Sequence, residues 1–237
     1  MTSTQPPGPE ILPRGDSAFV LRVADHFDEG VSDRVRALTW QMDRGRPEGV
    51  LDVVPGYTEI LVVFDPACRD VPGVVAWMAA VAGAAVETRE PAAPRLVTVP
   101  VCFDDRWALD LPALAARAGV SVPDWIGRFV ATPFRCVVLG FRPGFPYLTG
   151  MPEALSAPRH PSPRAFVPAG AVAVAGAQAG IYPVEGPGGW QIVGRSPLRL
   201  FVPRRSQPFF IQPGDDVRFV PIDSARFEAL QEAEPSP

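Results

Sequence analysis

The sequence of 237 residues contains no lysine, because all 22 of its basic residues are arginine. Lysine makes the P-loop contact to a nucleotide phosphate, forms Schiff bases and carries covalently attached biotin. These three chemistries are therefore excluded for this chain, and no biotin is expected on it.

Histidine and cysteine are also scarce. The histidines are His26 and His160, and the cysteines are Cys68, Cys102 and Cys136. No group of these residues with Asp or Glu has metal-ligand spacing, and neither histidine lies near a Gly-x-Ser-x-Gly nucleophile elbow. An odd number of cysteines without a Cys-x-x-Cys pair favours a reducing compartment, so we predict a cytoplasmic protein without a metal site.

Long runs of one charge sign and long apolar runs are absent as well. The net charge is −4 and the pI is near 5.3, and no basic stripe is present, which argues against a nucleic-acid partner. The longest apolar run, Val71 to Val86, has 16 residues and contains Pro72 and Gly73. It is shorter than the ~18 residues that a membrane span needs. The first residues, Thr2 to Pro9, lack the pattern of a secretory signal.

The chain does have enough hydrophobic residues, 47%, for a real core, and its length allows one large domain or two ordinary ones. Residues 1–15 are predicted to be a disordered leader, and residues 90–94 a linker. Residues 16–90 are predicted to form a small α+β domain with the ferredoxin-like order strand, helix, strand, strand, helix, strand. Its predicted elements are the strand Ala18–Val23, a helix capped by Ser32 and stopped by Gly45, the strands Val50–Val54 and Glu59–Phe64, the helix Val71–Ala82 and the edge strand Ala84–Thr88.

Residues 95–237 are predicted to form a closed β-barrel, because many short β-rich segments alternate with glycine and proline turns. Cys102 and Cys136 fall in apolar strand-like runs and are expected in the core. The predicted strands are Leu96–Cys102, Cys136–Phe141, Phe166–Pro168, Ala171–Ala175, Trp190–Val193, Leu198–Val202 and Asp216–Pro221; the predicted helices are Asp110–Ala118 with Asp110 as its cap, Val122–Val130 and Arg226–Glu232.

The stretch from Gly140 to Phe201 is the most informative part of the chain. Its prolines and glycines predict rigid loops, which carry Phe, Tyr, Trp and Arg. Such loops suit a ligand site, but aromatic plugs at the ends of a barrel would use the same residues, so both interpretations stay open.

Charged residues in this stretch indicate an anionic ligand. Arg159, Arg164 and Arg195 lie in rigid Pro/Gly contexts and together could bind a carboxylate or phosphate, although for any single one the pattern favours a surface arginine that packs its stem. Glu153 and Glu185 are the acidic candidates for a base, and Glu153 could instead open a helical turn. The loop 186–189 could hold an anion or be a plain turn.

The same stretch resembles the family of 5-oxoprolinase B subunits, also named allophanate hydrolase subunit 1, which includes the sporulation kinase inhibitor Kip. The resemblance extends weakly through Gly15-Asp16-Ser17, Val54-Pro55-Gly56-Tyr57 and Phe64-Asp65-Pro66. The residues that match the family motif are Gly140, Phe141, Pro143, Gly144, Phe145, Tyr147, Leu148, Pro158, Arg159, Pro163, Arg164, Val167, Pro168, Gly170, Tyr182, Pro183, Pro187, Gly188, Gly189, Trp190, Gly194, Arg195 and Pro197.

This resemblance implies an N-terminal ferredoxin-like α+β domain followed by a cyclophilin-like β-barrel. It implies ATP-dependent opening of 5-oxoproline to glutamate, in a complex with homologues of the A and C subunits of 5-oxoprolinase, by a chain that is inactive alone. Because the chain lacks lysine, we expect ATP to be shared with, or supplied by, a partner subunit. The alternatives are an inhibitor of a sensor histidine kinase, and a carboxyltransferase-related subunit that acts on urea-derived carboxylates with biotin carried by another protein.

The resemblance also implies a binding site for a small anionic substrate. Glu185 and Arg195 are weak catalytic candidates. One departure is visible: relatives usually carry a histidine where this chain has Phe129, and a tyrosine where it has Phe134. The expected substrate-binding residues are Phe141, Pro143, Gly144, Phe145, Tyr147, Arg159, Arg164, Tyr182, Gly188, Gly189, Trp190 and Arg195.

Overall fold

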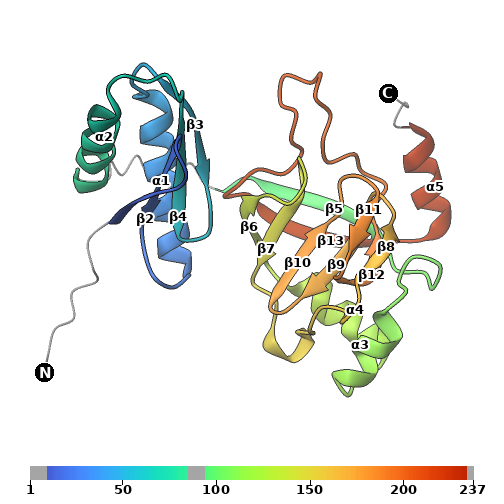
Figure 1. Ribbon diagram of the computed structural model, residues 1–237. Coiled ribbons are helices and arrows are strands. Elements are labelled where there is room, and N and C mark those ends of the chain that lie inside the picture. The colour runs from blue at the N-terminus through green and yellow to red at the C-terminus, as the bar shows by residue number, and fades with distance from the viewer. Residues whose placement is uncertain (1–9, 85–93, 234–237) are drawn as a thin grey trace, which may run out of the picture. The chain divides into compact units, whose positions relative to one another are not determined.

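The computed structural model of the protein describes residues 10–84 and 94–233 (Figure 1). The chain divides into two compact units, Met1–Ala93 and Pro94–Pro237, each with a hydrophobic core of its own.

The first unit is a four-stranded antiparallel sheet in the order β1-β2-β4-β3, with two helices packed on it. Leu38 and Met42 of α1 and Met78 of α2 share one buried cluster with Leu21 and Ile60 of the sheet. This helical spacing gives each helix one apolar face, which the sheet covers. The elements are β1 (Glu10–Pro13), β2 (Ala18–Arg22), α1 (Glu29–Arg44), β3 (Val50–Pro55), β4 (Glu59–Phe64) and α2 (Val71–Gly83).

Two predictions for this unit are wrong. Residues 10–13 are not a disordered leader, because they form β1 and pair with β2 along its whole length. The first helix is capped by Asp28 rather than Ser32: the carboxylate of Asp28 accepts from the Val31 N–H at 2.7 Å, so the helix begins four residues earlier. The predicted edge strand Ala84–Thr88 lies, from residue 85 on, outside the described residues. The ferredoxin-like topology therefore stays a prediction.

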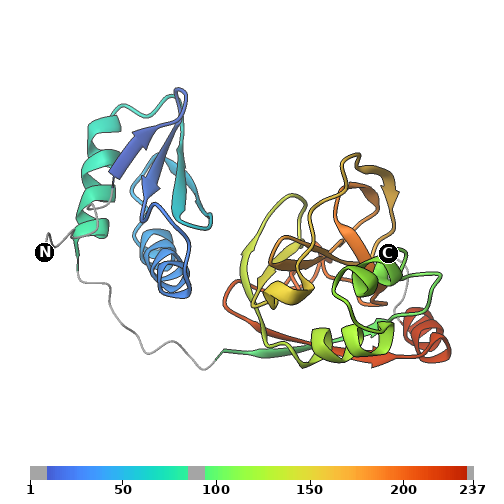
Figure 2. The ribbon, with the colours of Figure 1, turned by 90° about the horizontal axis from the view of Figure 1, so that it is seen from below.

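The second unit is built on a closed barrel of seven strands in the order β10-β7-β6-β13-β5-β12-β9. Strands β5 and β13 pair in parallel over seven residues each and run side by side toward α5 (Figure 2). Strands β8 and β11 form a separate two-stranded ribbon. The elements are β5 (Leu96–Cys102), α3 (Leu111–Arg117), α4 (Val122–Ala131), β6 (Phe134–Leu139), β7 (Pro146–Thr149), the 3₁₀ turn η1 (Glu153–Leu155), β8 (Arg164–Val167), β9 (Ala171–Ala175), β10 (Gln178–Ile181), β11 (Gly186–Gly188), β12 (Gln191–Arg195), β13 (Asp216–Ile222) and α5 (Ser224–Ala233).

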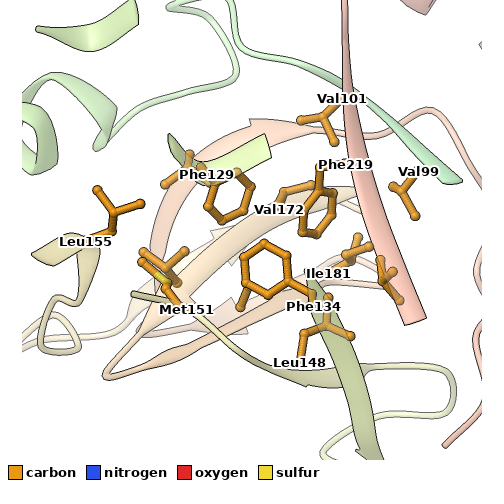
Figure 3. Packing of buried hydrophobic residues seen from close by; sticks show 14 of the residues in the cluster. Val99, Val101, Phe129, Phe134, Leu148, Met151, Leu155, Val172, Ile181 and Phe219 are labelled. Carbon is orange, nitrogen blue, oxygen red and sulfur yellow. The ribbon is translucent and has the colours of Figure 1, made fainter. Parts of the chain in front are cut away.

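Aromatic rings fill the barrel interior next to α4 (Figure 3). Phe129 is completely buried and stacks on Phe219 of β13 at 5.0 Å and on Trp125 at 5.1 Å. Phe134 packs against both Phe129 and Phe219. The two positions at which the chain departs from the family motif therefore belong to the core.

Strand β9 is buried on both faces, and its alternation assigns each side chain to one of two clusters. Val172 and Val174 join the cluster inside the barrel, whereas Ala171, Ala173 and Ala175 join a second cluster on the outer wall. The inner side chains are branched and the outer ones are small. The outer wall of β9 therefore leaves room for larger side chains from elsewhere.

The prediction of an α+β protein with a closed barrel is confirmed, and its cyclophilin-like character stays a prediction. Cys102 and Cys136 are buried, as expected. Residues 198–202 do not form a strand, because only Phe201 makes a bridge, to Phe209. Strand β6 ends at Leu139, before Phe141.

In the described part of the chain, no helix is both long and apolar enough to cross a membrane.

Candidate functional site

A hollow of about 270 Å³ lies on the outer wall of the barrel, next to the ribbon of β8 and β11. Three loops of the predicted stretch contribute to it, around residues 141–147, 159–163 and 182–190. The lining residues are Phe141, Phe145, Tyr147, Arg159, Pro163, Tyr182, Pro187, Gly188, Gly189 and Trp190.

Phe145 is the centre of the aromatic group in this hollow. Its ring centroid lies 4.9 Å from Tyr147, 5.3 Å from Tyr182 and 5.5 Å from Trp190, with the last two rings edge to face. Beneath it lies Gly180 of β10, where a Cβ atom would come within 2.7 Å of Phe145 Cζ. A side chain at position 180 would therefore displace the ring on which the other aromatics pack.

Tyr182 holds the glycine loop in place. The backbone N–H of Trp190 donates to its hydroxyl, and a Cβ atom on Gly188 would overlap that oxygen. Burial raises the pKa of the Tyr182 phenol above its ordinary value, although the Trp190 N–H and the charge of Arg159 oppose this. The phenol is therefore neutral at physiological pH.

Arg159 is the cation that lines the hollow. Its Cζ atom lies 5.8 Å from the centroid of the Trp190 ring, within cation–π range. No carboxylate of the described residues pairs with it. Burial raises the pKa of Tyr147, and the positive charge of Arg159 partly offsets that rise. The guanidinium can therefore receive an external anion.

Phe141 borders the hollow in a strained backbone conformation. Its φ is +60°, and no other non-glycine residue in the described ranges has a positive φ. Such a conformation costs on the order of 1–2 kcal/mol. The side chain is 58% exposed, yet its ring contacts Phe145 at 5.5 Å and Tyr182 at 6.2 Å. Strain of this kind tends to be retained at binding sites.

Arg164 does not line the hollow, which corrects its prediction as an anion-binding residue. It forms two hydrogen bonds to Asp110, at 2.6 Å and 2.9 Å, and one to His160 at 2.7 Å. The N–H of Ile192 also donates to Asp110 at 2.6 Å. Burial would raise the pKa of Asp110, but the bonds from Arg164, Ile192 and His160 outweigh it and lower that pKa.

Five further predicted residues lie outside the lining of the hollow. The Arg195 guanidinium lies 4.4 Å from the Trp107 ring and donates to the Ala169 carbonyl, so it is a packing residue. Burial lowers its pKa. Pro143 and Gly144 form the turn behind Phe145, and Glu185 is an exposed residue before β11. Glu153 opens the 3₁₀ turn η1, as one of its two interpretations predicted.

Comparison with known proteins gives the family. Residues 9–211 match the model of the carboxyltransferase domain, subdomain C and D. The chain belongs to this family. It is 33% identical to the 5-oxoprolinase B subunit of Bacillus subtilis (strain 168), over 92% of this chain and 95% of that protein. It is 43% identical to the 5-oxoprolinase B subunit of Escherichia coli O157:H7, over 57% of this chain and 62% of that protein.

Solved structures share the fold of this chain. The crystal structure of TTHA0988 has a TM-score of 0.77 at 36% identity, over 93% of this chain. This chain spans only 41% of that longer chain. The Kluyveromyces lactis urea carboxylase has a TM-score of 0.77 at 19% identity, over 94% of this chain and 22% of that chain, which shows a shared fold. Membership of the family of 5-oxoprolinase B subunits, expected from the sequence motif, is confirmed.

In this member of the carboxyltransferase-domain family, the hollow has the residues of a binding site rather than of a complete catalytic centre. Its aromatic rings can pack on a small ring or chain, and Arg159 can pair with an anion. Among the described residues, those that line it include no carboxylate, histidine or thiol. A general base for a reaction at this hollow would therefore need to come from elsewhere, because the Tyr147 and Tyr182 phenols are protonated at neutral pH.

Sequence reasoning missed three residues outside the lining of the hollow: Asp110 and His160, which bind Arg164, and Arg142, which lies over Phe141. Asp110 was interpreted only as a helix cap, yet its side chain makes no capping bond. His160 was noted only as scarce, and Arg142 occupied a variable position of the motif. The contact between His160 and Arg164 could have been predicted, because both residues lie in one rigid loop. The contact between Asp110 and Arg164 could not, because the two residues are 54 positions apart in the sequence.

Proposed function

We propose that this chain is the B subunit of an ATP-dependent 5-oxoprolinase and that its hollow binds 5-oxoproline. The observation that carries the proposal is Arg159, an arginine that no carboxylate of the described residues pairs with, beside an aromatic group, in a chain that aligns with 95% of a 5-oxoprolinase B subunit. The carboxylate of 5-oxoproline would pair with Arg159, and its five-membered ring would pack against Trp190 and Phe145.

The chemistry requires partner subunits. ATP would transfer its γ-phosphoryl group to the lactam oxygen and leave as ADP. Water would then add to the activated carbon and the C–N bond would break, which frees the amine. A second water would release phosphate and leave glutamate. Because the chain has no lysine and the lining of the hollow offers no carboxylate, histidine or thiol, we assign ATP binding and base catalysis to surfaces shared with the A-type and C-type subunits.

The other expected functions have no support of their own. No observation on the described residues favours an inhibitor of a histidine kinase or a protein that acts on urea-derived carboxylates. The three free cysteines suit a reducing cytoplasm, which stays part of the proposal.

The test is an ATP-dependent assay of 5-oxoproline hydrolysis with this chain and homologues of the A-type and C-type subunits, each omitted in turn. We expect activity only in the complete mixture. Arg159→Gln should raise KM by about tenfold or more, because a charge-assisted hydrogen bond is lost. Arg117→Gln, in the exposed last turn of α3, is the matched control and should leave KM unchanged.

Two outcomes would contradict the proposal. One is a stable complete complex without activity on 5-oxoproline. The other is activity that persists at the same rate when this chain is omitted.

A further inference from the structure

Among the described residues, a second arginine without an ion-pair partner, Arg142, lies over the ring of Phe141, which lines the hollow. The Cζ atom of Arg142 is 5.6 Å from the centroid of the Phe141 ring, and its Nη2 atom lies so close to Gly186 that a Cβ atom there would overlap it. Within residues 10–84 and 94–233, no carboxylate pairs with Arg142. Arg164, in contrast, is occupied by Asp110.

Arg142 and Arg159 approach the aromatic group at two different rings. Arg142 lies over Phe141 and Arg159 over Trp190, and each of these rings meets Phe145 edge to face at 5.5 Å. Phe145 therefore links the two ring–arginine pairs. A ligand that packs on Phe145 has one cation near Trp190 and another near Phe141.

The absence of a side chain at position 186 lets the Arg142 guanidinium lie against the backbone of β11. Gly186 has a φ of +156° and opens β11, whose next residues, Pro187 and Gly188, line the hollow. Any side chain at position 186 would meet the guanidinium of Arg142. The backbone that shapes the hollow therefore leaves room for this cation.

We infer that the hollow binds small organic molecules with two anionic groups, one group at Arg159 and the second at Arg142. This inference rests on the proposed function and names the species that the site favours. 5-Oxoproline has one carboxylate and an uncharged lactam. When the γ-phosphoryl group of ATP moves to the lactam oxygen, an O–P bond forms, the bond to ADP breaks, the lactam nitrogen releases its proton to solvent, and the lactam end gains an anionic phosphate group.

Arg142 therefore interacts mainly with charge that develops during the reaction. An interaction that is stronger with the phosphorylated species than with the substrate raises kcat rather than lowering KM. Arg159 contacts the carboxylate, which is present throughout, so its removal weakens the binding of every species.

Calorimetric titration of the full chain tests the inference, with glutarate as a five-carbon dianion and 5-oxoproline as a monoanion. We expect glutarate to bind about tenfold more tightly than 5-oxoproline. Arg142→Gln should abolish that preference and leave the affinity for 5-oxoproline within about twofold, whereas Arg142→Lys should retain part of it. Arg159→Gln should weaken both ligands, and Arg117→Gln should weaken neither.

The results separate this inference from the proposed function. Three results would overturn the two-anion site. The two ligands could bind with equal affinity, Arg142→Gln could lower the affinity for both equally, or neither ligand could bind. The omission assay decides the proposed function independently of these titrations. In the assembled complex, a lower kcat with unchanged KM for Arg142→Gln is expected, and a raised KM with unchanged kcat would count against the assigned role.

Discussion

Phe129 is the residue at which the chain departs most visibly from the motif of its family. It is completely buried between Trp125 and Phe219, and it is absent from the lining of the hollow. A histidine at this position would bring polar nitrogens into an aromatic stack. The departure therefore changes the packing of the barrel interior and leaves the residues of the hollow unaltered.

We expect Phe129→His to lower the free energy of unfolding by about 2–3 kcal/mol, because the imidazole would be buried without a hydrogen-bond partner. The indole N–H of Trp125 has no partner, but the two rings stack at 19°, so this in-plane N–H does not point at position 129. Urea denaturation at pH 8 measures the loss, and Phe129→Leu is the apolar control with a smaller cost. A Phe129→His variant as stable as the wild type would contradict this account.

Asp110 joins three elements: it precedes α3, accepts the N–H of Ile192 in β12 and binds Arg164 at the start of β8. Asp110→Asn should lower the free energy of unfolding by about 2–3 kcal/mol, less than for a fully buried pair because Arg164 is partly exposed. Asp105→Asn, an exposed change in the same loop, should have almost no effect on urea denaturation at pH 7. Equal losses in the two variants would contradict a specific role for Asp110.

The same cluster predicts how stability depends on pH. The hydrogen bonds of Asp110 hold its folded pKa below the ordinary unfolded value of about 4, so the unfolded chain takes up the proton first as the pH falls. The contribution of Asp110 is therefore complete above about pH 4 and is lost as the pH falls through its folded pKa. Urea denaturation between pH 7 and pH 2.5 should show a shallower acid loss in Asp110→Asn. Parallel profiles would contradict the assignment.

At the level of elements, the sequence predicted helices and long strands better than the short strands around the hollow. The helix 122–130 and the strands 96–102 and 171–175 show clear periodicity, and the structure forms them with nearly the same bounds. Strands β7, β10 and β11 were missed because they have only three or four residues, two of them with glycine. Their pairing depends on barrel closure, which no local pattern contains.

The candidate site was predictable only as far as local sequence could show it. Eight of the twelve expected binding residues line the hollow, and all eight lie in the aromatic loops of one stretch of sequence. Arg164 and Arg195 were not separable from Arg159 by local context. Only the tertiary structure brings Asp110 to Arg164 and Trp107 to Arg195. Of the three arginines, Arg159 is therefore the one that faces the hollow.

At the scale of the whole molecule, every residue that lines the hollow and every contact that supports it comes from the second unit. This unit closes its own barrel and has a continuous core, so it meets the conditions for independent folding. We predict that residues 94–237 alone give one cooperative urea transition. They should also bind glutarate within about threefold of the full chain's affinity, because no lining residue is removed.

Circular dichroism and calorimetric titration of this fragment provide the measurement, and the fragment with Arg159→Gln is its control. The control should keep the cooperative transition and lose most of the affinity. A fragment that folds cooperatively but binds glutarate more than about tenfold more weakly than the full chain would contradict this prediction. In that case the lining residues of the barrel unit would not account for the affinity, and the deleted residues 1–93 would contribute to it.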